Sequence, residues 1–184
     1  DIAAAIRDEG VRADRAFTGR CNLFAESAGI LVVDKNSIDA LNRVDEAITV
    51  ATLPAYKPVV EGEMIATVKI IPFAVPGAAR DQAVAAAVKA KPVIRIAPYK
   101  VRKVGIVSTL LPGLSPKVID KTLKITATRI APAGAKIIAE QRVPHERAGL
   151  ARAIDELLKA GAELVIVFGA SAIADRRDVI PAAV

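Results

Sequence analysis

Two segments in the second half of the chain combine small residues with groups that bind anions. The first runs from Ser108 to Ser115 and begins with two hydroxyl groups. The second runs from Gly169 to Asp178 and contains a pair of arginines. Small residues let a ligand approach backbone N–H groups closely, and guanidinium groups bind phosphate through paired hydrogen bonds. We therefore predict one phosphate-binding site formed by both segments. Its predicted contact residues are Ser108, Thr109, Lys117, Gly169, Ala170, Ser171, Arg176 and Arg177.

The acidic residues of the second segment indicate a further chemistry. Asp175 and Asp178 flank the two arginines, and carboxylates can hold Mg²⁺ or orient a nucleophile during phosphoryl transfer. Both are therefore candidate catalytic residues and candidate Mg²⁺ ligands. A structural role is an equally good interpretation. Asp178 stands where the N-cap of a following helix belongs, and the two arginines can simply be solvated.

Three neighbouring polar residues also have structural explanations. Ser115 precedes Pro116, a pair typical of a helix start, which favours capping over ligand contact. Lys117 opposes the dipole of that helix, and either a bound anion or a solvated side chain relieves the conflict. His145 is the one histidine, and no second histidine or cysteine stands beside it. A surface or capping role is therefore favoured for His145 over a transition-metal site.

The order of elements in the second half predicts how these segments are positioned. Apolar runs typical of strands alternate with helical patterns, which gives the order β-α-β-α-β-α. Helical connections of this length imply parallel strands, and ligands bind beyond the carboxyl ends of parallel strands. Both candidate segments lie at that edge. The expected strands are 104–109, 135–139 and 163–168, and the expected helices are 115–132, 146–160 with Leu150, Ile154, Leu157 and Leu158 on its inner face, and one from Val179.

The first half has a different rhythm and is predicted to be a smaller α+β domain of unknown role. Short β-rich runs occur at 29–34, 48–53, 64–71 and 93–96. A helix is expected over 37–44 with Ser37 as its N-cap, and an alanine-rich helix over 78–89. Pro98 marks the expected junction, so the predicted domains are 1–97 and 98–184 of an α/β protein.

Composition and charge limit the classes of partner. Residues 1–97 hold 12 basic and 12 acidic side chains, whereas residues 98–184 hold 14 and 8, so the whole net charge of +6 lies in the second half. A basic domain favours anionic partners. Nucleic acid is the less favoured one, because aromatic and basic residues do not interleave. No apolar run approaches the roughly 18 residues of a membrane span. The single cysteine fits a reducing compartment, so we expect a cytoplasmic protein.

The second half resembles the molybdopterin-binding domains of molybdenum-cofactor biosynthesis. Val165 to Ser171, followed by Arg176-Arg177-Asp178-Val179-Ile180-Pro181, is similar to the family's apolar strand, glycine-rich loop and Arg-Asp-Val-x-Pro segment. Val143 to Glu146 is similar to its (Ile/Val)-Pro-Asp-(Glu/Asp) segment. The likeness runs from about Lys103 to Val184 and implies a three-layer parallel-sheet domain. It is nearest to bacterial proteins in which a nucleotidyltransferase domain follows, and it implies that this domain is incomplete at residue 184.

The resemblance implies binding of molybdopterin or the molybdenum cofactor, with Mg²⁺ as a further candidate. A nucleotidyltransferase domain, a molybdoenzyme or a second copy of the chain are the candidate protein partners. The family adenylates molybdopterin or inserts molybdate into it, yet this chain departs from its acidic positions. Leu110-Leu111 replaces one expected acid and His145 another, whereas Asp178 is kept. Binding is therefore better supported than catalysis, and a non-catalytic module that senses the cofactor or a nucleotide remains the alternative.

Overall fold

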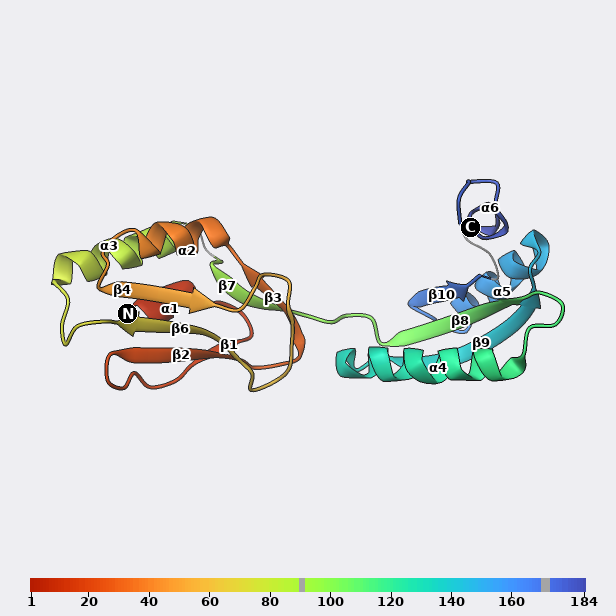
Figure 1. Cartoon of the computed structure of the whole chain (residues 1–184), viewed down its shortest axis with the longest axis horizontal. Helices are drawn as coiled ribbons and strands as arrows, with labels where there is room; N and C mark the ends of the chain where they lie inside the picture. The colour runs from red at the N-terminus through yellow and green to blue at the C-terminus, as the bar shows by residue number, and fades with distance from the viewer. Residues whose placement is uncertain (90–91, 170–172) are drawn as a thin grey trace. The chain divides into compact units, whose positions relative to one another are not determined.

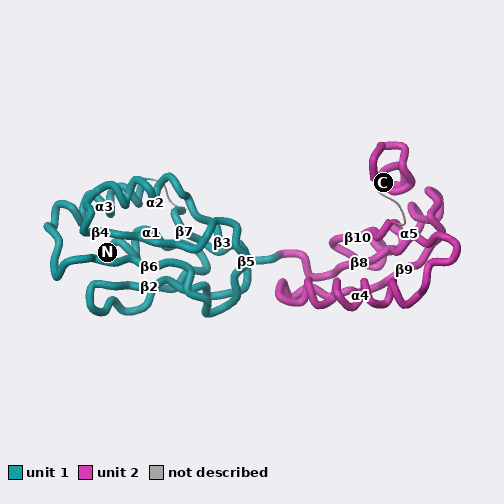
Figure 2. The backbone as a smooth tube through the Cα atoms, viewed as in Figure 1, with its two compact units in different colours: residues 1–99 teal, residues 100–184 magenta. Residues whose placement is uncertain are grey.

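The computed structural model describes residues 1–89, 92–169 and 173–184, which form two compact units. The first unit is Asp1–Tyr99 and the second is Lys100–Val184 (Figure 2). The boundary between them follows Tyr99, close to Pro98, where the sequence predicts a junction. Each unit has its own hydrophobic core, so each is described by itself.

The first unit is built on two antiparallel sheets. One has the strand order β1-β2-β6-β4 (Figure 1), and the other has the order β5-β3-β7. Their strands are β1 (Val11–Ala13), β2 (Arg20–Ala25), β3 (Gly29–Val33), β4 (Ile48–Thr52), β5 (Pro58–Val59), β6 (Met64–Ile70) and β7 (Ile94–Pro98). The strands expected at 29–34, 48–53, 64–71 and 93–96 are thereby confirmed, whereas β1, β2 and β5 were not predicted.

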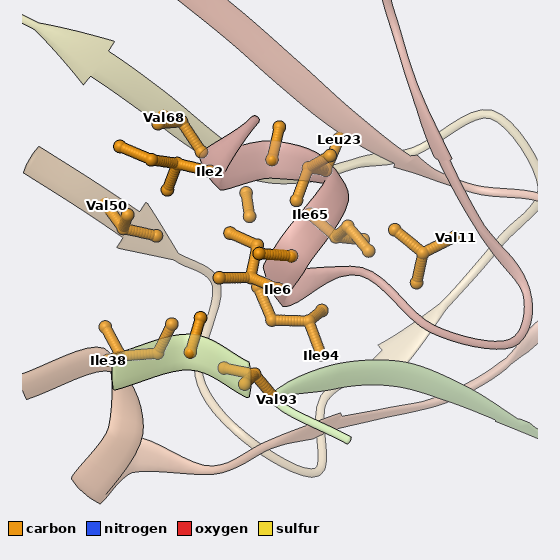
Figure 3. Close-up of a cluster of buried hydrophobic side chains, with 14 of the residues drawn as sticks. Ile2, Ile6, Val11, Leu23, Ile38, Val50, Ile65, Val68, Val93 and Ile94 are labelled. Atoms are coloured by element: carbon orange, nitrogen blue, oxygen red, sulfur yellow. The ribbon is translucent and has the colours of Figure 1, made fainter. Parts of the chain in front are cut away.

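Three helices complete this unit, and the shortest is central to it. Figure 3 shows Ile2 and Ile6 of α1 (Ile2–Ile6) among buried side chains that come from both sheets. Ile6 is completely buried, as are Leu23 and Ile94. The helices α2 (Lys35–Asn42) and α3 (Gly77–Val88) pack against each other, and α3 also contacts α1. The sequence predicted the two longer helices but missed α1, whose five residues are too few for a periodic pattern.

The start of α2 corrects the predicted N-cap. The cap is Asp34, whose carboxylate accepts hydrogen bonds from the backbone N–H of Asn36 at 3.1 Å and from the hydroxyl of Ser37. Ser37 lies inside the helix and is buried. Both residue types favour N-caps, but the strand before the helix ends at Val33, so Asp34 occupies the position where the backbone turns.

The end of α2 is fixed to the edge of a sheet by Asn42. Its amide nitrogen donates to the carbonyl of Val50 at 2.9 Å, and its amide oxygen accepts from the N–H of Val50 at 2.7 Å. Val50 belongs to β4, the outer strand beside β6. The Asn42 side chain therefore satisfies both backbone groups of Val50 in the way a neighbouring strand would.

The second unit contains a parallel three-stranded sheet with β8 in the centre. The strand order is β10-β8-β9, and β8 pairs in parallel with both neighbours, as predicted. Its elements are β8 (Lys103–Leu110), α4 (Pro116–Ile130), a 3₁₀ turn (Ala131–Ala133), β9 (Lys136–Pro144), α5 (Arg147–Lys159), β10 (Leu164–Phe168) and α6 (Val179–Ala183). The strand β9 ends five residues later than the expected limit at Ala139. This extension brings Pro144 opposite Leu110 at the carboxyl end of the sheet.

The two faces of this sheet pack against different helices. On one face Ile106 and Ile166 pack with Leu123 of α4, and on the other Val107 packs with Leu150 of α5. The alternation of side chains along β8 produces this division, because successive residues point to opposite faces. Strands that are apolar on both faces are typical of parallel sheets covered by helices.

Close packing of α5 depends on Gly105. A Cβ at this position would lie 3.1 Å from the Leu157 side chain and 3.2 Å from Ala162. The predicted inner face of α5 needs one correction, because Leu158 is 51% exposed, whereas Ala153 is buried. Ser115 precedes α4 as predicted, but its side chain makes no capping hydrogen bond. Across the described ranges, no helix combines the length and apolar character needed to cross a membrane.

Leu157 and Leu158 provide a matched test of this packing. We expect Leu157→Ala to lower the free energy of unfolding of the second unit by about 2–5 kcal/mol, because it leaves a cavity beneath β8. Leu158→Ala should cost less than about 1 kcal/mol, because half of that side chain already contacts solvent. Urea unfolding followed by circular dichroism measures both values. Equal losses for the two variants would contradict the placement of this helix.

Candidate functional site

A cavity of about 310 Å³ lies at the carboxyl end of the parallel sheet. Its polar lining includes Ser108 and Thr109 at the end of β8, where both residues are buried. Gly169, which directly follows β10, also lines it. The register places Phe168 opposite Ser108, so the carboxyl ends of the two strands lie together. The structure thus brings three of the predicted contact residues to one cavity.

Apolar side chains form most of the cavity wall. Leu111 and Leu114 contribute from the segment after β8, Val118 from the first turn of α4, and Phe168 from the last position of β10. Leu111, Leu114 and Val118 are 48%, 40% and 53% exposed, which is high for residues of their size and indicates an open apolar mouth. These residues were not predicted to be ligand contacts, since apolar side chains ordinarily belong to the core.

Thr109 is held by contacts from two other segments. Its hydroxyl oxygen lies 2.9 Å from Nδ1 of His145, and the hydroxyl donates to the carbonyl of Phe168 at 3.3 Å. The backbone N–H of His145 donates to the carbonyl of Leu110 at 3.1 Å, which fixes the residue after β9 beside the end of β8. The hydroxyl, the imidazole and the end of β10 therefore form one hydrogen-bonded group at the edge of the cavity.

His145 is a candidate site residue whose contact with Thr109 was not predicted from the sequence. The sequence favoured a surface or capping role, whereas the structure places its imidazole against Thr109 of the cavity. The family resemblance places His145 where an acid is expected, and a further signal was its position directly after Pro144. That signal becomes informative once β9 is known to extend to Pro144, because the residue after it then reaches the shared carboxyl edge of the sheet.

Asp178 organises the backbone that leads into α6. One oxygen of its carboxylate accepts hydrogen bonds from the N–H groups of Ala174 at 2.6 Å and Asp175 at 2.9 Å. The N–H of Asp175 and then that of Ala174 lower the pKa of Asp178 below its usual value, and the nearby charge of His145 lowers it further. Asp178 precedes the helix as expected, but its carboxylate bonds backward to the loop instead of forward to the N–H groups of α6.

The remaining predicted residues lie on the outside of the second unit. Lys117, Arg176 and Arg177 are exposed, and none is among the described residues that line the cavity. Asp175 is also exposed, and its carboxylate accepts the N–H of Arg177 at 2.8 Å. Ala170 and Ser171 lie outside the described residues.

The two predicted Mg²⁺ ligands, Asp175 and Asp178, hold the backbone of their own loop. One oxygen of Asp178 and one of Asp175 already accept backbone hydrogen bonds. Within ranges 1–89, 92–169 and 173–184, no group of three or more His, Cys, Asp or Glu residues is arranged to hold a metal ion. Mg²⁺ usually keeps several waters and is held by one or two carboxylates together with substrate phosphates, so the two aspartates stay predicted ligands.

Comparison with known proteins adds no family assignment. No protein-family model matches the chain, and a search of curated proteins finds no significant match. The resemblance to molybdopterin-binding domains therefore stays a prediction from the sequence.

The pKa of Asp178 provides a direct test of the loop geometry. Because backbone N–H groups and a neighbouring positive charge lower this pKa in the folded state, ionised Asp178 stabilises the fold above its usual pKa. That contribution should be lost as pH falls through the lowered folded value.

In an NMR pH titration, we expect the amide protons of Ala174 and Asp175 to shift with a midpoint below the usual aspartate pKa. Asp178→Asn keeps an oxygen acceptor but removes the charge, so it should abolish this transition. A midpoint at or above the usual value would be inconsistent with the two hydrogen bonds.

Proposed function

We propose that the second unit binds a phosphate-bearing pterin, molybdopterin or the molybdenum cofactor, and that it serves the assembly of that cofactor in the cytoplasm. The observation that carries this proposal is the cavity at the carboxyl edge of the parallel sheet, where hydroxyl groups and apolar walls meet. Its volume of about 310 Å³ falls at the lower end of the range typical of small-molecule sites.

The chemistry of the lining suits a flat ring with polar edges. Leu111, Leu114 and Val118 offer an apolar surface for the face of a ring, and Phe168 lines the cavity as well. The hydroxyls of Ser108 and Thr109 can exchange hydrogen bonds with ring nitrogens or a carbonyl oxygen. The combination of apolar walls with hydroxyl groups supports a heteroaromatic ligand over a purely aliphatic one, because such a ligand can use both kinds of surface.

The phosphate is assigned to the segment that begins at Gly169. Gly169 lacks a side chain that would obstruct close approach to the backbone, and the exposed Arg176 and Arg177 follow within the same segment. In this proposal the two guanidinium groups contact the phosphate when the ligand is bound. Seven of the 14 basic residues of this half are arginines, and the half carries the entire net positive charge, which supports an anionic ligand.

Binding is favoured over nucleotidyl transfer within this half of the chain. Charge neutralisation around a reacting phosphate ordinarily requires Mg²⁺ held by several oxygen ligands. Asp175 and Asp178 each use a carboxylate oxygen to hold backbone N–H groups, and His145 replaces an acid that the resemblance leads one to expect. The hydrogen bonds of these two carboxylates also support the second candidate function, a module that senses the cofactor or a nucleotide without transforming it.

Thr109 and Thr128 form a matched pair for testing the cavity. Thr109→Val removes a hydroxyl that lines it, whereas Thr128→Val removes one that bonds the carbonyl of Lys124 on an exposed part of α4. We expect Thr109→Val to weaken molybdopterin binding about twofold to tenfold, the value of one neutral hydrogen bond. Thr128→Val should bind like the wild type.

Fluorescence titration of the full chain under anaerobic conditions measures these affinities, and inorganic phosphate serves as a competitor for the phosphate position alone. Circular dichroism establishes that both variants are folded. Wild-type protein without measurable affinity for molybdopterin, or equal weakening by both variants, would contradict the proposed site.

Catalysis is tested separately from binding. We expect the chain, incubated with molybdopterin, Mg²⁺ and either ATP or CTP, to bind the pterin without forming nucleotidylated product, because the described carboxylates hold backbone groups. Mass spectrometry of the released pterin gives the result. Multiple turnovers that Asp178→Asn abolishes would overturn the binding-only proposal.

A further inference from the structure

Three hydroxyl side chains among the described residues line the cavity at the parallel sheet, and they differ in what they contact. The hydroxyl of Thr122 donates to a carbonyl of its own helix at 2.9 Å. The hydroxyl of Thr109 is bonded to the Phe168 carbonyl and meets the imidazole of His145. The hydroxyl of Ser108 has no hydrogen-bond partner within the part of the chain that the structure describes. Its full hydrogen-bonding capacity is therefore left for a ligand.

Ser108 is also almost completely enclosed. It is 3% exposed, and the residues before it on the same face of β8, Val104 and Ile106, belong to the buried core. The pattern of this face thus predicts an apolar residue at position 108. Alanine would fit the same space, because it differs from serine only by the hydroxyl oxygen. A buried hydroxyl that makes no bond within the protein costs stability instead of adding to it.

A ligand that fills the cavity must separate the Ser108 hydroxyl from solvent. A ligand with a polar group at this point replaces the hydrogen bond that solvent provided, whereas a purely apolar ligand leaves the hydroxyl without any partner. An unsatisfied buried hydroxyl lowers affinity by roughly fivefold to a hundredfold. The hydroxyl therefore acts as a penalty against ligands that lack a matching group, and such penalties are an effective source of specificity.

We propose that Ser108 determines which ring the cavity accepts. Its hydroxyl selects a fused heterocycle that presents a ring nitrogen or a carbonyl oxygen, and it rejects a hydrocarbon ring of the same shape. The apolar walls contact the face of either ring, so they provide affinity without this selectivity. The inference rests on the proposed function, because it assigns the polar edge of the pterin to Ser108.

Two compounds of similar shape test the selectivity. Pterin and naphthalene both consist of two fused six-membered rings, but only pterin carries nitrogen and oxygen atoms. Fluorescence titration of the full chain with each compound gives the ratio of the two affinities. We expect the wild type to prefer pterin. Ser108→Ala should lower the ratio at least about tenfold, because it loses a bond to pterin and no longer penalises naphthalene.

A second buried serine among the described residues provides a matched control. Ser37 is 6% exposed, and its hydroxyl bonds the carboxylate of Asp34 in the first unit. Ser37→Ala should therefore lower the urea midpoint of the first unit but keep the wild-type ratio of affinities. Ser108→Ala removes no bond within the protein, so the midpoint of the second unit should stay the same or rise. NMR amide signals followed during urea unfolding separate the transitions of the two units.

The two measurements separate failure of this inference from failure of the proposed function. A lower urea midpoint for Ser108→Ala would overturn the role of Ser108, because its hydroxyl would then stabilise the fold. An unchanged ratio of affinities in this variant, or a wild type without preference for pterin, would also overturn it, while binding of molybdopterin would leave the proposed function standing. A wild type that binds neither molybdopterin nor pterin would overturn both.

Discussion

The parallel pairing of β8 with a strand on each side is the constraint from which the second unit follows. Parallel neighbours require a connection that returns to the starting edge, so a helix follows β8 and another follows β9. The two helices cover opposite faces of the sheet. On the face that α5 covers, Gly105 leaves room for the side chain of Leu157. The same direction of all three strands brings their carboxyl ends to one edge. The cavity, Thr109 and His145 lie together for that reason.

The polar groups at this edge are largely engaged with one another. Thr109 contacts His145 and the Phe168 carbonyl, while Asp178 holds the N–H groups of its own loop. A site built in this way is ordered before a ligand arrives, which lowers the entropy lost on binding. This prior order supports the proposal that the cavity recognises a ligand.

Sequence reasoning succeeded where a signal was local and failed where it depended on long-range pairing. Apolar runs and the Ser115-Pro116 pair predicted β8 and α4, and the positions of Ser108, Thr109 and Gly169 at the cavity followed from the strand order. The strand β2 escaped prediction because its mixed polar residues, Arg20–Ala25, are stabilised by pairing with β6. The last residues of β9 include Gln141 and Arg142, which are typical of a loop but tolerable on an outer strand. The contact between Thr109 and His145 spans 36 residues and depends on that register.

The two hydrogen bonds between Asn42 and Val50 affect how readily this sheet can pair with another extended chain. An outer strand ordinarily offers unpaired backbone groups to any extended chain, which is a common beginning of aggregation. At the middle of β4 both groups are already taken by one amide side chain. A foreign strand could not add there without first displacing Asn42. One side chain at the end of a helix thus blocks strand addition at Val50, the middle residue of this outer strand.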